Sequence, residues 1–264
     1  MASRAEQKAA ARAAREARLK AASKNQERNA RLMKLGGLVA GVTIVIVVIV
    51  VAVGGGSSTL TPKKTKALVT SLLAGIPQSG NTLGNPNAKI TVVEYGDLVC
   101  PICQEFAVGG EASAIRNEVR QGKVKFVYRA TETASGSNNN GEFVAGQVAA
   151  KAAGLQHKEW NYILTWYNEQ KSETTPYVTN GWLQQLAQQI PGLNLAKWQQ
   201  DRNSTALANQ VKAEEQDIAD LVAQKAIPAI ETPTLVFTGP KGTPPPVQAA
   251  LTYSDLKTAF KEVT

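Results

Sequence analysis

The sequence predicts an α/β domain that is interrupted by a block of helices and preceded by a single transmembrane helix. Three observations lead to this expectation. Residues 35–53 form a long uncharged apolar run, and residues 89–130 have a strand, helix, strand pattern. Helical periodicity then dominates from about residue 136 to residue 227, before further strands follow.

The apolar run LGGLVAGVTIVIVVIVVAV, residues 35–53, contains 19 residues and no charge. As a helix it would be ~28 Å long, close to the ~30 Å hydrocarbon core of a bilayer. A cleavable signal peptide is the alternative, but its apolar region is usually about 7 to 15 residues long and a small-residue cleavage site follows it. No such site follows residue 53. We therefore expect a permanent anchor, with the protein embedded in the membrane through residues 35–53.

The charge of the chain lies at one end. The formal net charge is +8, and residues 1–34 alone hold ten Lys or Arg against three Asp or Glu. The remainder is almost neutral, which argues against a basic face for nucleic acid. The basic segment instead predicts a cytoplasmic tail under the positive-inside rule. Residues after 53 would then lie outside the cell membrane, in a single-pass arrangement.

Residues 54–75 are expected to be a linker, because GGGSSTLTPKKTK is rich in small and polar residues and only a short helix follows it. The folded domain is expected over 76–264. AKITVVEYG predicts a strand at 89–95, and a helix should begin at Pro101, since proline is favoured in the first turn. Gly109-Gly110 should break or kink this helix before a second strand at 123–130.

The insertion at about 136–227 reads as helical throughout. Its segments are EFVAGQVAAKAAG, KEWNYILTWYNEQ, GWLQQLAQQI and a long stretch that ends with ALANQVKAEEQDIADLVAQKA. All four tryptophans lie here, and core packing explains them better than ligand stacking. A third strand at 234–239, a possible fourth at 247–252 and a closing helix capped by Ser254 complete the chain. A βαβ half and a ββα half on either side of a helical block have the topology of a thioredoxin-like domain.

The chain has only two cysteines, Cys100 and Cys103. A disulfide between them closes too small a loop to stabilise a fold much. Cys100 precedes a helix, where unpaired amides and the helix dipole favour a thiolate and lower its pKa, and Cys103 lies one turn further, as a resolving thiol.

An inert small-loop disulfide is the structural alternative. A metal site is disfavoured because zinc takes four ligands and His157 is the single histidine; that histidine also argues against a Ser-His-Asp hydrolase. We expect no metal and no cofactor beyond the redox-active disulfide.

VVEYGDLVCPIC, followed much later by ETPTLVFTG, resembles the DsbA-type thiol-disulfide oxidoreductases of the thioredoxin superfamily, and most of all their membrane-anchored extracytoplasmic bacterial members. The resemblance implies that Cys100 is the nucleophile and Cys103 the resolving cysteine. It makes Pro101 and Ile102 the variable pair that tunes the couple. Thr232 and Pro233 match the loop that carries a cis proline against the cysteines.

Glu94 matches the buried acid of this family, which exchanges a proton with Cys103. The alternative is a strand residue that points outward. Asp97 is a second candidate for the same role, but it follows the strand in a loop, where we expect it to be solvated. Strongly oxidising members often carry His as the second residue between the cysteines, whereas this chain has Ile102, so the strength of oxidation is open.

The sequence therefore predicts an extracytoplasmic enzyme that exchanges disulfides with exported proteins bearing cysteine thiols, with oxidation as the favoured direction and a membrane protein as its redox partner. One alternative is a disulfide reductase or isomerase of the same fold. An alternative of another class is a membrane-tethered binding or chaperone-like module in which the CxxC is not essential.

Overall fold

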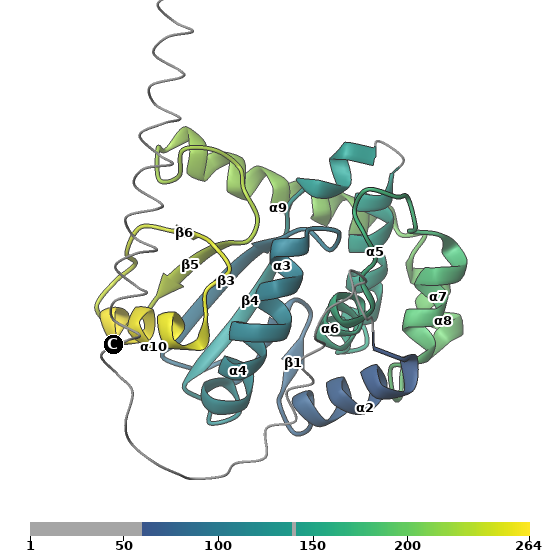
Figure 1. Ribbon diagram of the computed structural model, residues 1–264, viewed down its shortest axis with the longest axis horizontal. Coiled ribbons are helices and arrows are strands. Elements are labelled where there is room, and N and C mark those ends of the chain that lie inside the picture. Colours follow the sequence, from purple (N-terminus) through teal and green to yellow (C-terminus); the bar gives the residue numbers. More distant parts are fainter. Residues whose placement is uncertain (1–59, 139–140) are drawn as a thin grey trace, which may run out of the picture. The chain divides into compact units, whose positions relative to one another are not determined.

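A mixed β-sheet organises the part of the chain that the computed structural model describes, residues 60–138 and 141–264. The basic tail and the apolar run at 35–53 lie outside these residues. Among the helices within them, none is both long and apolar enough to cross a bilayer. The sheet has the strand order β1-β2-β4-β3-β5-β6 (Figure 1). Its strands are β1 (Gln78–Ser79), β2 (Thr82–Leu83), β3 (Ile90–Gly96), β4 (Val124–Ala130), β5 (Thr234–Thr238) and β6 (Val247–Gln248).

The centre of the sheet is the pair β3 and β4, which run parallel, with β5 antiparallel to β3 on its other side. Because successive side chains of a strand point to opposite faces, Val92 and Glu94 share one face and Val93 and Tyr95 share the other. Val92 belongs to the main core, together with Cys103. Val93 and Tyr95 pack instead with residues of a smaller cluster. Glu94 is therefore directed toward the helix that carries the cysteines.

That helix runs without a break from Pro101 to Val119. It consists of α3 (Pro101–Phe106), a π-helical turn η1 (Ala107–Glu111), a short α4 (Ala112–Ala114) and a second π-helical turn η2 (Ile115–Val119). Of the break or kink expected at Gly109-Gly110, the break is wrong, because the helix continues through both glycines as η1. A Cβ at Gly110 would overlap the carbonyl oxygen of Leu251, whereas one at Gly109 would meet no atom. Gly110 is thus needed for close packing against the segment before α10, and the helix widens into a π-turn around it.

Helix α2 (Pro62–Leu73) changes the expected boundary of the domain. It begins with proline in its first turn, as helices often do, and buries Val69, Leu72 and Leu73 in the main core. Residues 62–73 are therefore part of the folded domain and not of a linker over 54–75. The lysines of this segment are typical of a solvent-exposed linker, which explains the expectation. The apolar residues Val69, Leu72 and Leu73, however, lie on one face of a helix.

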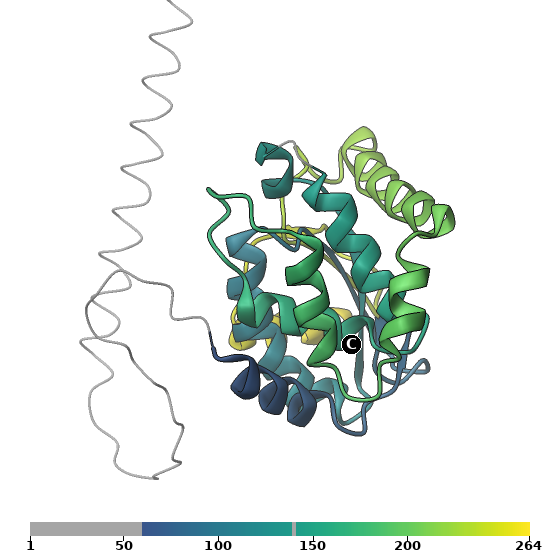
Figure 2. The same ribbon diagram turned by 90° about the vertical axis from the view of Figure 1, so that its right-hand side faces the viewer.

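The insertion between β4 and β5 is helical, and Figure 1 shows its helices gathered mainly beside the sheet, with α10 near the opposite edge. Its elements are the 3₁₀ turn η3 (Ala134–Asn138) and the helices α5 (Glu142–Gly154), α6 (Glu159–Glu169), α7 (Asn180–Gln188), α8 (Leu195–Asp201) and α9 (Thr205–Ala223). The single long stretch expected at the end of this block is two helices, α8 and α9. Figure 2 shows α9 in light green at the margin of the block.

Aromatic packing holds the insertion together. Trp160, Trp166 and Trp198 are completely buried, and Trp182 nearly so, which agrees with a role in the core. The rings of Trp166 and Trp182 meet edge to face with centroids 4.5 Å apart, a favourable arrangement for two aromatic side chains.

The C-terminal part is shorter in strand than expected. A strand was expected at 247–252, but β6 contains only the first two of these residues, and residues 249–252 are not in a strand. Helix α10 (Tyr253–Val263) follows, and its N-cap is Thr252 rather than Ser254. The Thr252 hydroxyl accepts from the backbone amide of Asp255 at 3.3 Å, and the Asp255 carboxylate accepts from the amide of Thr252 at 3.1 Å. This reciprocal capping box satisfies two amides that a serine at position 254 would leave unpaired.

Candidate functional site

The two cysteines lie at the carboxyl end of β3, on the first turn of α3. Cys100 is the N-cap residue of the helix and Pro101 its first residue. Both thiols are free, so this is the dithiol form of the couple. Cys100 keeps 6% of its surface exposed, whereas Cys103 is completely buried. A bulky partner can therefore reach only the first sulfur.

The surroundings of Cys100 favour its thiolate. Its pKa is lowered to about 6, first because the Cys103 thiol donates a hydrogen bond to it. Thr232 and the backbone amides of Ile102 and Cys103 add further hydrogen bonds, and partial burial opposes them. The free amides at a helix N-terminus account for the backbone share of this effect.

Cys103 has the opposite character. Burial raises its pKa well above the ordinary value of a thiol, and its hydrogen bond to Cys100 and the nearby Cys100 and Glu94 charges raise it further. At neutral pH the dithiol therefore consists of a Cys100 thiolate and a Cys103 thiol. This asymmetry suits a couple in which one sulfur attacks or leaves and the other is held in reserve.

The loop before β5 closes the site from the other side. The peptide bond between Thr232 and Pro233 is cis, as the family resemblance implies. The Cys100 sulfur lies 3.5 Å from the Thr232 carbonyl oxygen. The Thr232 hydroxyl lies 2.6 Å from that of Thr133, which links this loop to the start of the insertion. Ile102 is 46% exposed, so its side chain presents an apolar surface beside the reactive sulfur.

Asp97 is not the solvated loop residue that its position suggested. It is completely buried, and its carboxylate accepts hydrogen bonds of 2.9 Å from the backbone amides of Val99, Thr133 and Ser135. The hydroxyl of Ser135 donates to it as well. Asp97 therefore organises the segment that enters the insertion, and through Thr133 it supports the loop of Thr232.

Glu94 is completely buried, so the outward-facing alternative is wrong. In the sheet it lies between Tyr128 of β4 and Leu235 of β5. Burial raises its pKa from 4.5 to about 7, a hydrogen bond with Glu111 lowers it, and the charge of Cys100 raises it. A carboxyl group with a pKa near neutrality can both give and take a proton under working conditions.

Glu111 is a buried acid that the sequence reasoning missed. It lies in η1, completely buried, with its carboxyl group against that of Glu94. A signal for it exists in the sequence, because one helical face repeats at intervals of three and four residues. That face contains Cys103, Phe106, Ala107, Gly110, Glu111, Ala114 and Ile115.

Two other features lie apart from the cysteines. His157 is in the turn after α5, with a φ of 58°, and lines a pocket with Ile76 and Pro191.

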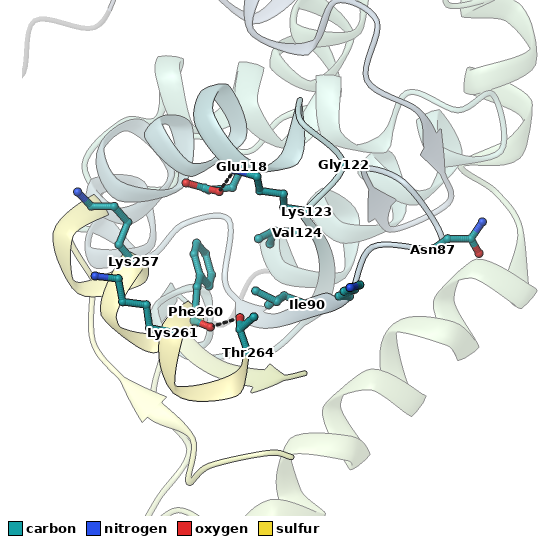
Figure 3. Close-up of a pocket in the computed structure, with 11 residues that line it drawn as sticks. Asn87, Ile90, Glu118, Gly122, Lys123, Val124, Lys257, Phe260, Lys261 and Thr264 are labelled. Carbon is teal, nitrogen blue, oxygen red and sulfur yellow. Dashed lines mark hydrogen bonds and ion pairs between the residues drawn. The ribbon is translucent and has the colours of Figure 1, made fainter. Parts of the chain in front are cut away.

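A cavity of about 600 Å³ is lined by Ile90, Val124 and Phe260, with Lys257 and Lys261 at its rim (Figure 3). Since β3 and β4 begin at this cavity and the cysteines follow the other end of β3, the cavity is not part of the thiol site. Within the described residues, no cluster of three or more His, Cys, Asp or Glu side chains is arranged to hold a metal ion.

Comparison with known proteins gives a consistent result. A family model described as thioredoxin matches residues 78–259. The chain is 24% identical over 146 residues to a protein of Bacillus anthracis named probable disulfide bond formation protein D, a match that covers 55% of this chain and 66% of that protein. Among solved structures, BdbD from Bacillus subtilis in its oxidised form has a TM-score of 0.56 at 21% identity, covering 71% of this chain and 96% of that one. DsbA from Chlamydia trachomatis has a TM-score of 0.56 at 17% identity, covering 69% and 90%.

Proposed function

The chain belongs to the thioredoxin family, and we propose that it is a thiol-disulfide oxidoreductase that exchanges disulfides with exported proteins through Cys100 and Cys103, with oxidation as its working direction. The observation that carries this proposal is the asymmetry of the two thiols. Cys100 keeps 6% of its surface exposed and its pKa is lowered to about 6, while Cys103 is completely buried with a raised pKa. The name of the Bacillus anthracis relative, probable disulfide bond formation protein D, supports disulfide formation as the direction.

The reaction begins with the Cys100–Cys103 disulfide. A substrate thiolate attacks the Cys100 sulfur, the bond between the two enzyme sulfurs breaks, and the electron pair leaves on Cys103, which takes up a proton. A second substrate thiolate then attacks the substrate sulfur of the mixed disulfide and expels the Cys100 thiolate. The substrate has lost two electrons and gained a disulfide, and the enzyme has become the dithiol.

The low pKa of Cys100 favours this direction for two reasons. A stabilised thiolate is a good leaving group in the second step, and it also stabilises the reduced enzyme, which makes the disulfide form more oxidising. The Thr232 carbonyl oxygen, next to the cis peptide bond, lies against the same sulfur.

The proposed location is the outer face of the cell membrane. The uncharged run at 35–53 and the excess of Lys and Arg before it support a single-pass anchor with a cytoplasmic N-terminus. A membrane protein that accepts two electrons would return the dithiol to the disulfide. Anchoring raises the effective concentration of the two partners for each other.

The reduction potential of the Cys100–Cys103 couple tests the direction. It is measured by equilibrating the protein with mixtures of reduced and oxidised glutathione. A value at or above about −180 mV places the couple with the oxidants, and a value near about −270 mV supports the reductase or isomerase alternative. Replacing Cys103 by serine should trap substrates as mixed disulfides on Cys100. If Cys100→Ser leaves the biological activity unchanged, the protein is a binding module and not an exchange enzyme.

A further inference from the structure

Glu94 and Glu111 form a pair of buried carboxyl groups beneath the cysteines. Both are completely buried. Their four side-chain oxygens find no other hydrogen-bond donor in the part of the chain that the structure describes. The two groups lie within hydrogen-bonding reach of each other, but two carboxylates cannot donate. A proton must therefore be held between them.

The groups around the pair leave no other way to neutralise it. Cys100 and Cys103 face Glu94 from α3, Tyr128 from β4 and Tyr167 from α6. Leu235 lies beside it on β5. None of these groups is a cation, and no Lys, Arg or His among the described residues forms an ion pair with either carboxyl group.

The two acids differ in how tightly they hold a proton. The pKa of Glu111 is raised well above its usual range by burial and by the charge of Glu94. The pKa of Glu94 is raised less, to about 7, because the hydrogen bond with Glu111 stabilises its carboxylate. Near neutral pH, Glu111 is then the protonated donor and Glu94 the acceptor that gains and loses a proton.

We propose that Glu111 is a positioning residue for proton transfer at Cys103: its protonated carboxyl group donates to Glu94 and keeps Glu94 able to exchange a proton with the buried sulfur. The inference rests on the proposed function, since it assigns the proton that the reaction moves. When the disulfide is attacked, the bond between the sulfurs breaks, Cys103 leaves with the electron pair and takes a proton from Glu94. The Glu94 carboxylate that remains accepts from Glu111. When the disulfide forms again, Cys103 returns the proton to Glu94.

Two substitutions separate donation by Glu111 from simple charge repulsion. Glu111→Gln keeps a donor of almost the same shape but cannot titrate. Glu111→Leu removes the donor and keeps the site buried. If Glu111 donates, the pKa of Glu94 stays near 7 in the first variant and rises in the second. If Glu111 is instead an ionised neighbour that repels Glu94, both substitutions lower that pKa.

The experiment uses the full chain, reduced, in detergent micelles, with ¹³C in the side-chain carboxyl groups of glutamate. Carboxyl shifts are followed against pH, and the signals of the pair are assigned by their loss in Glu94→Gln and Glu111→Gln. The wild type should show two coupled steps, and Glu111→Gln a single step near pH 7. Glu111→Leu should move the Glu94 step up by about one to two units, as expected for loss of a hydrogen bond to a charged group. Glu105→Gln, an exposed position on the same helix, is the matched control and should change nothing.

The oxidised enzyme is then reacted with a peptide dithiol in a single turnover across the same pH range. The midpoint of the rate profile should move with the Glu94 step in Glu111→Leu and return toward the wild type in Glu111→Gln. If Glu94 titrates alike in all three proteins, or at lower pH in both variants, the role of Glu111 is refuted. If Glu111→Leu proves too unstable to study, a Glu94 step at lower pH in Glu111→Gln than in the wild type still refutes it. Failure of the wild type to oxidise the peptide, with the carboxyl shifts as described, would instead refute the proposed function.

Discussion

Replacing Glu94 by glutamine should remove a pH-dependent destabilisation of the folded domain. The pKa of Glu94 is about 7 in the folded state against 4.5 for an exposed glutamate. The folded state therefore binds this proton more tightly than the unfolded state, and the free energy of unfolding falls as pH rises from about 4.5 through about 7. A difference of about 2.5 units corresponds to about 3 kcal/mol. The gain of the variant over the wild type should grow by about this amount between pH 4 and pH 8.

The measurement is urea unfolding of the reduced fragment 56–264, followed by circular dichroism at several pH values. Comparing the variant with the wild type at each pH cancels the titration of groups that do not interact with Glu94. A domain of this size would also show a difference in melting temperature that widens by about 6–12 °C over the range. Glu105→Gln should give a difference that does not depend on pH, because this side chain is exposed. If the Glu94→Gln difference is equally flat, Glu94 does not titrate in this window and its part in proton transfer is refuted.

Four further predictions concern the rest of the site and the fold. The thiolate absorbance of Cys100 should titrate near pH 6, and its midpoint should rise when Cys103→Ala removes the donor that is the first cause of the lowered pKa. Asp97→Ala should lower the free energy of unfolding by about 3 kcal/mol or more in urea denaturation, because two buried backbone amides and one partly buried amide lose their acceptor. Lys151→Met should lower it by about 3–5 kcal/mol, since the buried carboxylates of Glu214, 2.7 Å away, and Glu159, 3.7 Å away, both lose their cation; a double variant that also replaces Glu214 should recover part of the loss. Gly110→Ala should lower the free energy of unfolding by at least about 1 kcal/mol, because the added Cβ meets the segment before α10. Gly109→Ala should instead stabilise the helix by about 0.5–1 kcal/mol, because the added Cβ there meets no atom. Equal effects of the two substitutions would contradict the close contact.

The order of strands and helices around the cysteines could be predicted because local signals are strong there. β-Branched residues define β3 (Ile90–Gly96), and proline at position 101 marks the start of α3. The buried tryptophans of the insertion follow from their size and apolar character. By contrast, the strand expected at 247–252 has only two paired residues. In the antiparallel register Gln248 already faces Thr234, the first residue of β5, so the residues after 248 have no strand residue opposite them, whatever their own β propensity.

Asp97 could not be placed from the sequence because all but one of its partners lie far from it along the chain. An aspartate that follows a strand is solvated in most loops. Here the amides of Thr133 and Ser135 reach its carboxylate only because β4 ends next to β3 and the chain then turns over the end of the sheet. The burial of this carboxylate is thus a property of the parallel pairing and not of residues 96–99.

Glu111 was missed for a different reason, in which two local rules compete. Two consecutive glycines predict the end of a helix, and this rule hides the apolar face that continues from Cys103 to Ile115. Gly110, however, lies on that face, at the point where the chain before α10 packs against the helix. A glycine that a helix needs for close packing leaves the helical period intact on both sides. When the period is followed through the glycines, Glu111 is the one acidic residue of a buried face that also carries Cys103. Burying a charge at such a position costs free energy unless the charge is neutralised or takes part in the reaction. The helical period and this free-energy cost together mark Glu111 as a functional candidate.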